Sequence, residues 1–141
     1  MKVFKFTVVF ALAVLVLVAC VSSSDVKVDV LSVGNSLKSP SEVNRILGAD
    51  GLRIIDVRTL AEFTSGCISG AKNIDFKSSD FLNKISLLDK SGLYLVYCRS
   101  GGRSAQAVAQ MRGAGFNNIV ELKGGISGWE AEGYDLSENC K

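Results

Sequence analysis

Short apolar runs alternate with segments of helical spacing along most of this chain. The predicted strands cover residues 52–57, 71–74, 93–97 and 118–122. The predicted helices around them cover residues 39–47, 59–66, 79–88, 104–112 and 126–132. Strands that alternate with helices predict an α/β fold, with a small parallel sheet of about five strands flanked by helices on both faces. The alternation of Val with Lys and Asp over 26–30 makes that segment a candidate edge strand.

Two helix starts have a recognisable pattern of capping residues. Ser-Pro-Ser-Glu at 39–42 and Thr-Leu-Ala-Glu at 59–62 are capping boxes, and the first also has proline at the first helical position. Gly48 and Gly66 are the expected ends of these helices. The predicted helix 79–88 places apolar side chains on one face, namely Phe81, Leu82, Ile85 and Leu88.

The start of the chain differs in character from the rest. Residues 1–6 contain two lysines, and residues 8–19 form an unbroken apolar run, which is short for a bilayer span and typical of a signal peptide. The run ends in Leu-Val-Ala-Cys, which resembles the bacterial lipobox with Cys20 as the lipidated residue. We therefore expect a lipoprotein signal peptide at 1–19 and a lipidated tether, with the candidate edge strand, at 20–38. An ordinary secretory signal and an uncleaved anchor are the alternatives.

A lipid anchor at Cys20 would place the protein on a membrane of the bacterial cell envelope. About two acyl chains are enough for stable anchoring, whereas one is marginal. The next residues, Val21 and Ser22, are not acidic, which favours the periplasm-facing outer membrane. The sequence does not indicate an oligomeric state.

Composition excludes several chemistries. The chain contains no histidine, which rules out Ser-His-Asp and Cys-His catalysis and any His-ligated metal. Its cysteines, at 20, 67, 98 and 140, have no C-x-x-C spacing, so we expect no metal site and no cofactor. Lys2 and Lys5, in the predicted signal peptide, account for the formal charge of +2. The rest of the chain has balanced charge, which gives no reason to expect a nucleic-acid partner.

The residues after the 93–97 run carry the most specific chemistry. The expected site is Cys98 as nucleophile and the loop that surrounds it, made up of Arg99, Ser100, Gly101, Gly102, Arg103 and Ser104. Backbone N–H groups of the loop and the N-terminal end of the following helix favour a thiolate over a thiol. The glycines permit close approach of the backbone, and the arginines can hold the oxygens of an anion. The alternative is an inert core cysteine.

Four motifs follow one another along the chain. They are Ile-Asp-Val-Arg at 55–58 with Glu-Phe at 62–63, Gly-Cys-Ile-Ser-Gly-Ala-Lys-Asn-Ile at 66–74, the loop 98–103, and Leu-Lys-Gly-Gly-Ile at 122–126 with Trp129. Together they resemble a single-domain rhodanese, a sulfurtransferase of the thiosulfate sulfurtransferase class. The resemblance implies the rhodanese-like α/β fold, with the domain over 39–138.

This resemblance implies transfer of sulfane sulfur through a persulfide on Cys98. The partners would be a small anionic donor such as thiosulfate and a thiol or cyanide acceptor, with Asp56 and Arg58 as supporting residues. A non-catalytic redox or partner-binding module of the cell envelope is the alternative. Related phosphatases have a Cys-x5-Arg loop, whereas Cys98 and Arg103 bracket only four residues, which argues against a phosphatase.

The chain departs from the family pattern at two positions. Cys67 stands where histidine is common, and Ser69 stands where proline is common. Cys67 is either a packing substitution or a partner thiol for Cys98 or Cys140. Cys140 lies next to the last residue, where we expect mobility and assign no role.

Side chains near the motifs have simpler expected roles. Arg58 and Glu62 lie four residues apart and are expected to pair in a structural role. Phe63 and Trp129 are expected in the core, and Lys123 is expected to be solvated.

Overall fold

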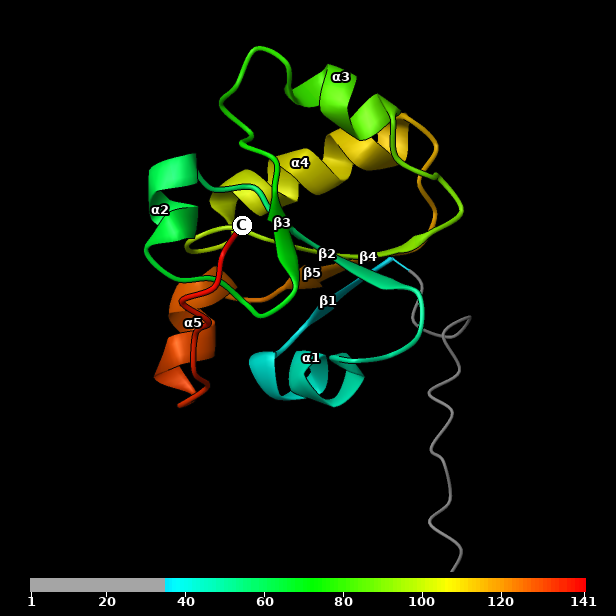
Figure 1. Ribbon diagram of the computed structural model, residues 1–141. Helices are drawn as coiled ribbons and strands as arrows, with labels where there is room; N and C mark the ends of the chain where they lie inside the picture. Colours follow the sequence, from blue (N-terminus) through cyan, green and yellow to red (C-terminus); the bar gives the residue numbers. More distant parts are fainter. Residues whose placement is uncertain (1–34) are drawn as a thin grey trace, which may run out of the picture.

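In the computed structural model, which describes residues 35–141, five parallel strands make up one sheet (Figure 1). They are β1 (Ser36–Lys38), β2 (Leu52–Asp56), β3 (Ala71–Asn73), β4 (Leu93–Tyr97) and β5 (Ile119–Leu122). Their order across the sheet is β1-β5-β4-β2-β3, which puts β4 at the centre, and every β4 residue is buried. The apolar sequence of β4 suits a strand covered on both faces. The predicted fold class is confirmed.

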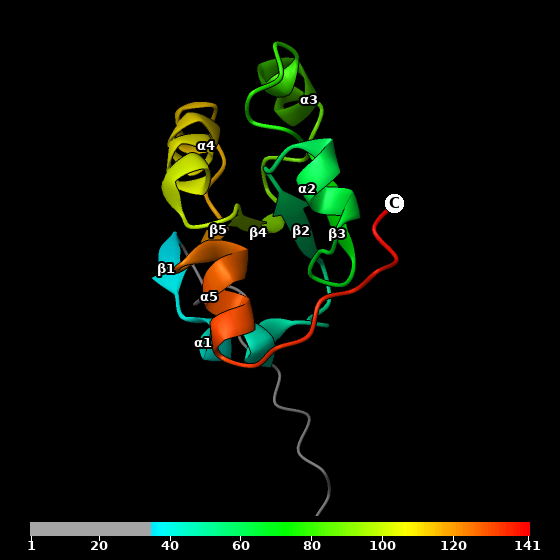
Figure 2. The ribbon, with the colours of Figure 1, turned by 90° about the vertical axis from the view of Figure 1, so that its left-hand side faces the viewer.

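The helices cover both faces of this sheet. They are α1 (Pro40–Ile46), α2 (Leu60–Thr64), α3 (Phe81–Ser86), α4 (Gly102–Gly113) and α5 (Gly125–Ala131). Figure 2 shows α3 and α4 on one side and α1 and α5 on the other. Both predicted capping boxes form, Ser39 with Glu42 and Thr59 with Glu62. None of the helices within residues 35–141 has the length and apolar character needed to cross a membrane.

Each face of the sheet buries its own apolar cluster. Alternate side chains of β4 enter one cluster or the other, Leu95 with α1 and α5, and Val96 with α3 and α4. This division follows from the two-residue period of side chains along a strand. Phe63 and Trp129, which are 1% and 3% exposed, belong to the cluster with α1 and α5, so both are core residues as expected.

The ends of two helices differ from the prediction. α3 is shorter than the predicted 79–88, and Leu82 is 59% exposed although Phe81 and Ile85 are buried. Each residue along a helix rotates the side chain by about 100°, so Leu82 points away from the face that Phe81 and Ile85 share. α4 begins at Gly102, two residues before the predicted Ser104.

The sequence pattern did not indicate β1. Its three residues contain no apolar run, and Leu37 is 59% exposed. What defines β1 is its parallel pairing with β5, in which Leu37 lies opposite Glu121. The candidate edge strand at 26–30, the predicted signal peptide and Cys20 all lie outside the described residues.

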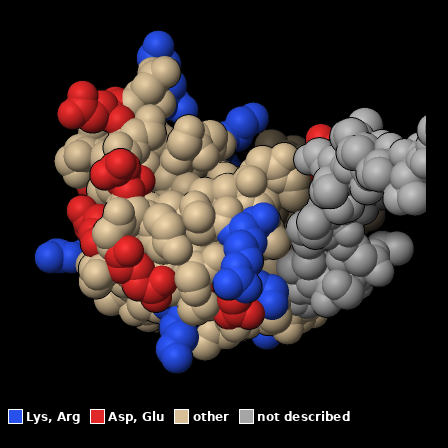
Figure 3. Space-filling model, turned by 90° about the horizontal axis from the view of Figure 1, so that it is seen from below, with Lys and Arg blue, Asp and Glu red and all other residues tan. Residues whose placement is uncertain are grey.

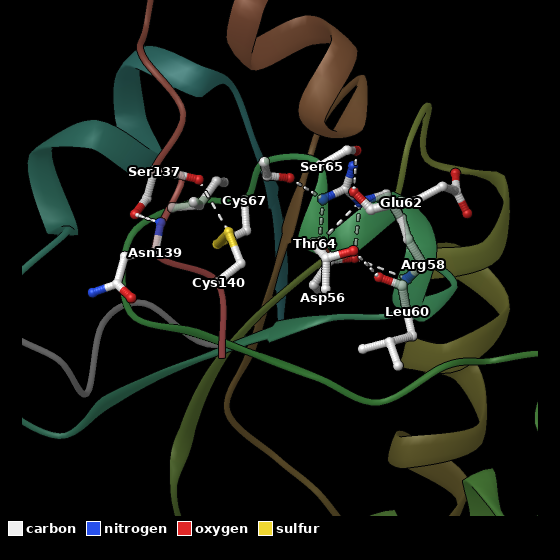
Figure 4. The surroundings of a disulfide bond; sticks show 12 residues. Asp56, Arg58, Leu60, Glu62, Thr64, Ser65, Cys67, Ser137, Asn139 and Cys140 are labelled. Carbon is white, nitrogen blue, oxygen red and sulfur yellow. Dashed lines mark hydrogen bonds and ion pairs between the residues drawn. A yellow bond between two sulfur atoms is a disulfide. The ribbon is translucent and has the colours of Figure 1, made fainter.

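The C-terminal tail is attached to the segment between α2 and β3 (Figure 4). Cys67 and Ser137 exchange backbone hydrogen bonds of 3.1 and 2.8 Å. Cys67 and Cys140, 73 residues apart in sequence, form a disulfide with their Cα atoms 6.0 Å apart. The expectation of a mobile Cys140 without a role is therefore wrong, because chain ends are mobile only where nothing ties them down. Of the alternatives for Cys67, the structure contains the partnership with Cys140.

Candidate active site

The loop after β4 lies at the carboxyl edge of the sheet, where parallel α/β sheets place their sites. Cys98 directly follows β4, and Asp56 ends the neighbouring β2, opposite Tyr97. α4 then begins at Gly102, and its N-cap Gly101 has a left-handed φ of 106°. Glycine adopts this conformation without strain. It turns the loop so that backbone N–H groups around the start of α4 face Cys98.

The sulfur of Cys98 is buried, but it lies among polar donors. The residue is 1% exposed. The N–H of Gly101 donates to Sγ at 3.2 Å, and the hydroxyl of Ser104 lies 3.6 Å away. Burial by itself raises the pKa of the Cys98 thiol, but hydrogen bonds from the Ser104 side chain and from the N–H groups of Ser104, Gly101 and Ser100 outweigh it and lower the pKa. Within residues 35–141, Cys98 is the free cysteine.

The start of α5 holds this loop from its other side. The N–H groups of Ile126 and Ser127 donate to the carbonyl oxygens of Cys98 and Arg99 at 2.9 and 3.0 Å. Gly125 permits this approach, because a Cβ there would lie 2.7 Å from the carbonyl carbon and oxygen of Arg99 and would also meet the oxygen of Cys98. Sequence reasoning placed this glycine in the fourth motif but assigned it no contact with the Cys98 loop. Its signal was the Gly-Gly pair directly before a helix.

The two arginines of the loop have different surroundings. Both terminal nitrogens of Arg103 donate to the carboxylate of Glu62, each at 2.7 Å. The hydrogen bonds from Arg103 hold the pKa of Glu62 well below its usual range. A two-point ion pair fixes the plane of the guanidinium, so Arg103 is held in place, whereas Arg99 is exposed. That these arginines hold the oxygens of an anionic donor stays a prediction.

Asp56 and Arg58 form a buried ion pair at the end of β2. Nε and Nη2 of Arg58 donate to the Asp56 carboxylate over 2.6 to 3.0 Å, and the side chains are 6% and 0% exposed. Nη2 also donates to the Gly66 oxygen at 2.6 Å. Burial alone lowers the pKa of Arg58, but the hydrogen bonds and charge of Asp56 raise it overall. Figure 4 shows this pair beside the disulfide.

The expected pairing of Arg58 with Glu62 is therefore wrong. A four-residue spacing brings side chains together only when both residues lie in one helix. α2 begins at Leu60, after Arg58, so Arg58 remains in the turn and pairs with Asp56. Glu62, inside the helix, faces Arg103 instead.

One further carboxylate reaches the site from β5. The hydroxyl of Ser104, which is fully buried, donates to Glu121 Oε1 at 2.8 Å. Glu121 lies outside the four sequence motifs, and sequence reasoning missed it. Its only signal was a charged residue in an apolar strand.

The described part of the chain can also be compared with what a metal site and a nucleic-acid-binding surface require. Within residues 35–141, no three Cys, Asp or Glu side chains lie together as a metal ion would require. On the face in Figure 3, acidic side chains line one edge and Lys and Arg are spaced among uncharged residues. Among the described residues visible there, the basic groups form no continuous stripe of the kind that follows a nucleic-acid backbone.

Known proteins share both this sequence pattern and this fold. A family profile described as "Rhodanese-like domain" matches residues 39–132. Thiosulfate sulfurtransferase 16 of Arabidopsis thaliana, a chloroplast protein, is 35% identical over 108 residues, which cover 67% of this chain and 90% of that protein. A sulfurtransferase of Allochromatium vinosum is 31% identical and covers 72% and 94%. The crystal structure of a rhodanese-related protein from Thermoplasma volcanium superposes with a TM-score of 0.66 at 30% identity, covering 74% and 100%.

Proposed function

This chain belongs to the rhodanese-like domain family, and on that premise we propose that it transfers sulfane sulfur through a persulfide on Cys98. The observation that carries the proposal is the surroundings of one sulfur atom. Sγ of Cys98 accepts the Gly101 N–H at 3.2 Å, and further donors of the loop lower the thiol pKa. The thiolate is the form of cysteine that attacks.

The proposed reaction has two displacement steps. In the first, the Cys98 thiolate attacks the outer sulfur of a donor such as thiosulfate. A new S–S bond forms, the donor's own S–S bond breaks, and sulfite leaves with its electron pair. In the second, a thiolate or cyanide attacks the outer sulfur of the persulfide, and the Cys98 thiolate leaves. The two steps together return the enzyme to its starting state without an external oxidant or reductant.

The backbone N–H groups around Cys98 support both steps, because they stabilise negative charge on sulfur in each. Negative charge resides on Cys98 Sγ before the first step and on the persulfide after it. Backbone N–H groups that are already oriented stabilise such charge without reorganising, and removal of one such donor in other enzymes costs roughly 3 kcal/mol. The exposed Arg99 supplies positive charge at the loop, which favours the approach of an anionic donor. Arg103, fixed by Glu62, supports the same loop.

Mass spectrometry tests the proposal directly. After incubation with thiosulfate and removal of excess donor, the peptide that contains Cys98 should gain the mass of one sulfur atom. Cyanide should then remove it and release thiocyanate. The Cys98→Ser variant should show neither change. An unmodified Cys98 in folded protein that had been reduced beforehand would overturn the proposal and favour the non-catalytic module.

The low exposure of Cys98 is the observation that keeps this second function open. A cysteine that is 1% exposed suits a redox or partner-binding module as well as an enzyme whose loop admits a small donor. Small reagents distinguish the enzyme from the module. A small sulfur donor or alkylating agent should reach Cys98 of the enzyme while the protein stays folded. Protection of Cys98 from both reagents in the folded protein would favour the module.

We further propose that the protein is attached to the bacterial cell envelope through a lipid on Cys20, facing the periplasm. The Cys67–Cys140 disulfide supports an oxidising compartment, because such bonds persist there and are rare in the reducing cytosol. In cell fractions the full chain should sediment with membranes, and Cys20→Ala should release it. Soluble full-length protein would contradict the anchor without affecting the proposed reaction.

A further inference from the structure

The Ser104 hydroxyl links the sulfur of Cys98 to a carboxylate on another strand. Ser104 lies in the first turn of α4 and is fully buried. Its Oγ accepts from the Cys98 thiol at 3.6 Å and donates to Glu121 Oε1 at 2.8 Å. The three side chains therefore form a chain of hydrogen bonds that runs from the reactive sulfur to the carboxylate.

Glu121 lies on the face of β5 that α4 covers. Its neighbours Val120 and Leu122 belong to the apolar cluster with α1 and α5, whereas Ile119 belongs to the cluster with α3 and α4. The alternation of side chains along a strand places Glu121 on the same face as Ile119. A half-buried carboxylate here needs a hydrogen-bond donor, because an unpaired polar group on an apolar face is costly. Ser104 is that donor.

The single hydroxyl proton of Ser104 has competing acceptors. The Gly101 carbonyl oxygen lies 2.9 Å from Oγ, the Glu121 carboxylate 2.8 Å, and the Cys98 sulfur 3.6 Å. A carboxylate is a stronger acceptor than a carbonyl or a neutral thiol. While Cys98 is protonated, the hydroxyl therefore points toward Glu121. When Cys98 loses its proton to solvent, the thiolate competes with Glu121 for the same hydroxyl.

We propose that Glu121 is a positioning residue that competes with Cys98 for the Ser104 hydroxyl and thereby restrains ionisation of the thiol. The proposal rests on the proposed function in one respect, that Cys98 is the reactive sulfur. The Ser104 hydroxyl and the backbone N–H groups of the loop promote this ionisation, and Glu121 restrains the share that comes from the hydroxyl. A change that neutralises Glu121 frees the hydroxyl to donate to the sulfur and favours the thiolate.

The other charged groups around Cys98 occur as pairs. They come from α4, α2 and the end of β2, and they are Arg103 with Glu62 and Arg58 with Asp56. Arg99 is exposed in the loop, and α5 contributes backbone N–H groups to the loop carbonyls. Glu121 forms no ion pair with another residue of 35–141. In that part of the chain, the side-chain partner of the Glu121 carboxylate is therefore the Ser104 hydroxyl and not a cation within ion-pair distance.

The test is the rate at which iodoacetamide alkylates Cys98, measured against pH on the full chain with its disulfide intact. Mass spectrometry of the peptide that contains Cys98 separates this reaction from any other thiol. Glu121→Gln should shift the rate profile to lower pH and accelerate alkylation near pH 6 on the order of tenfold. Glu130→Gln, the same charge change at an exposed position on α5, should follow the unmodified protein. An unshifted profile for Glu121→Gln would overturn the proposal.

A double variant tests the route through Ser104. In a Ser104→Ala background, Glu121→Gln should change the rate by less than about twofold, since the shared hydroxyl is gone. Equal acceleration in both backgrounds would show that the charge acts directly on the sulfur, and the proposed route would be wrong. Should Glu121→Gln fail to fold, Glu121→Asp withdraws the carboxylate from Ser104 and should accelerate alkylation in the same sense. Because alkylation needs no sulfur donor, failure of the persulfide test leaves this result unaffected.

Discussion

Cys98 and Cys67 are hidden from solvent to the same degree, each 1% exposed, yet their surroundings differ completely. The sulfur of Cys98 faces the Gly101 N–H and the Ser104 hydroxyl, and it is free. The sulfur of Cys67 is bonded to Cys140. The comparison teaches that burial alone does not decide what a cysteine can do. The donors and the partner within a few ångströms decide it.

The backbones around the two cysteines differ in the same sense. Cys98 is followed by a glycine-rich loop whose N–H groups are left over from the start of a helix. Cys67 uses its N–H and its carbonyl in hydrogen bonds to Ser137, so its backbone has no donor to spare. The loop after Cys98 can therefore stabilise negative charge, whereas the segment around Cys67 attaches the C-terminal tail.

The largest predicted difference between the two regions is in activity. Cys98→Ser should lower the rate of thiocyanate formation from thiosulfate and cyanide by roughly 10³-fold or more, because no other group can replace the nucleophile. The paired Cys67→Ser and Cys140→Ser substitutions should leave that rate within a few-fold of the unmodified protein. Comparable losses in both variants, with folding intact, would mean that the contrast between the two cysteines is wrong.

For the free energy of unfolding, the order of the two variants should be reversed, with the larger loss on removal of the disulfide. The Cys67→Ser/Cys140→Ser protein should lose roughly 2–5 kcal/mol of its free energy of unfolding in urea, since the disulfide joins residues 73 positions apart in sequence and closes a long loop. Cys98→Ser should lose much less. Added reductant should bring the unmodified protein to the stability of the double variant. Equal stability with and without reductant would show that the disulfide contributes nothing.

Gly125 tests how closely α5 must approach the Cys98 loop. Gly125→Ala should cost roughly 2–4 kcal/mol of stability and displace the loop, because its Cβ would overlap the backbone of Arg99 and Cys98. Gly101→Ala is the matched control, since its φ of 106° is also left-handed but nothing lies within 4 Å of the added Cβ. It should cost only about 1 kcal/mol. Equal losses, measured by urea unfolding, would rule out steric contact as the cause.

The smallest predicted effect concerns the ion pair that fixes Arg103. The pKa of Glu62 is lowered from 4.5 in the folded protein, chiefly by hydrogen bonds from Arg103. The pair therefore stabilises the fold fully above about pH 4.5, and this contribution is lost progressively as the pH falls further toward the folded-state pKa. Glu62→Gln should lower the free energy of unfolding by roughly 1–2 kcal/mol at pH 7.

That deficit should shrink as the pH falls below 4.5, because acid weakens the unmodified pair but not the amide. Urea unfolding at several pH values measures it. Glu138→Gln, an exposed position in the tail, controls for the change of charge. A deficit that stayed constant across this range would remove the pH-dependent role of the Glu62–Arg103 pair.

Local patterns predicted most of the elements because their causes are local. Ser39 and Thr59 form the capping boxes that their spacing indicated, and β4 lies where its apolar run predicted. The position of Cys98 at the end of the 93–97 strand also followed from the sequence, whereas the central place of that strand came from the structure. β1 could not be predicted in this way, since its pairing with β5 rather than its own composition defines it.

The chain sequence by itself determined the order of the helices and of the strands from β2 to β5, the fold class and the placement of the cysteine loop at the edge of the sheet. Only the tertiary structure decided the partners: Cys67 with Cys140, Glu62 with Arg103, and Ser104 with Glu121. These partners are 73, 41 and 17 residues apart. Helical and strand periods relate only near neighbours, so contacts over such separations exist only after the sheet has assembled and brought its edges together.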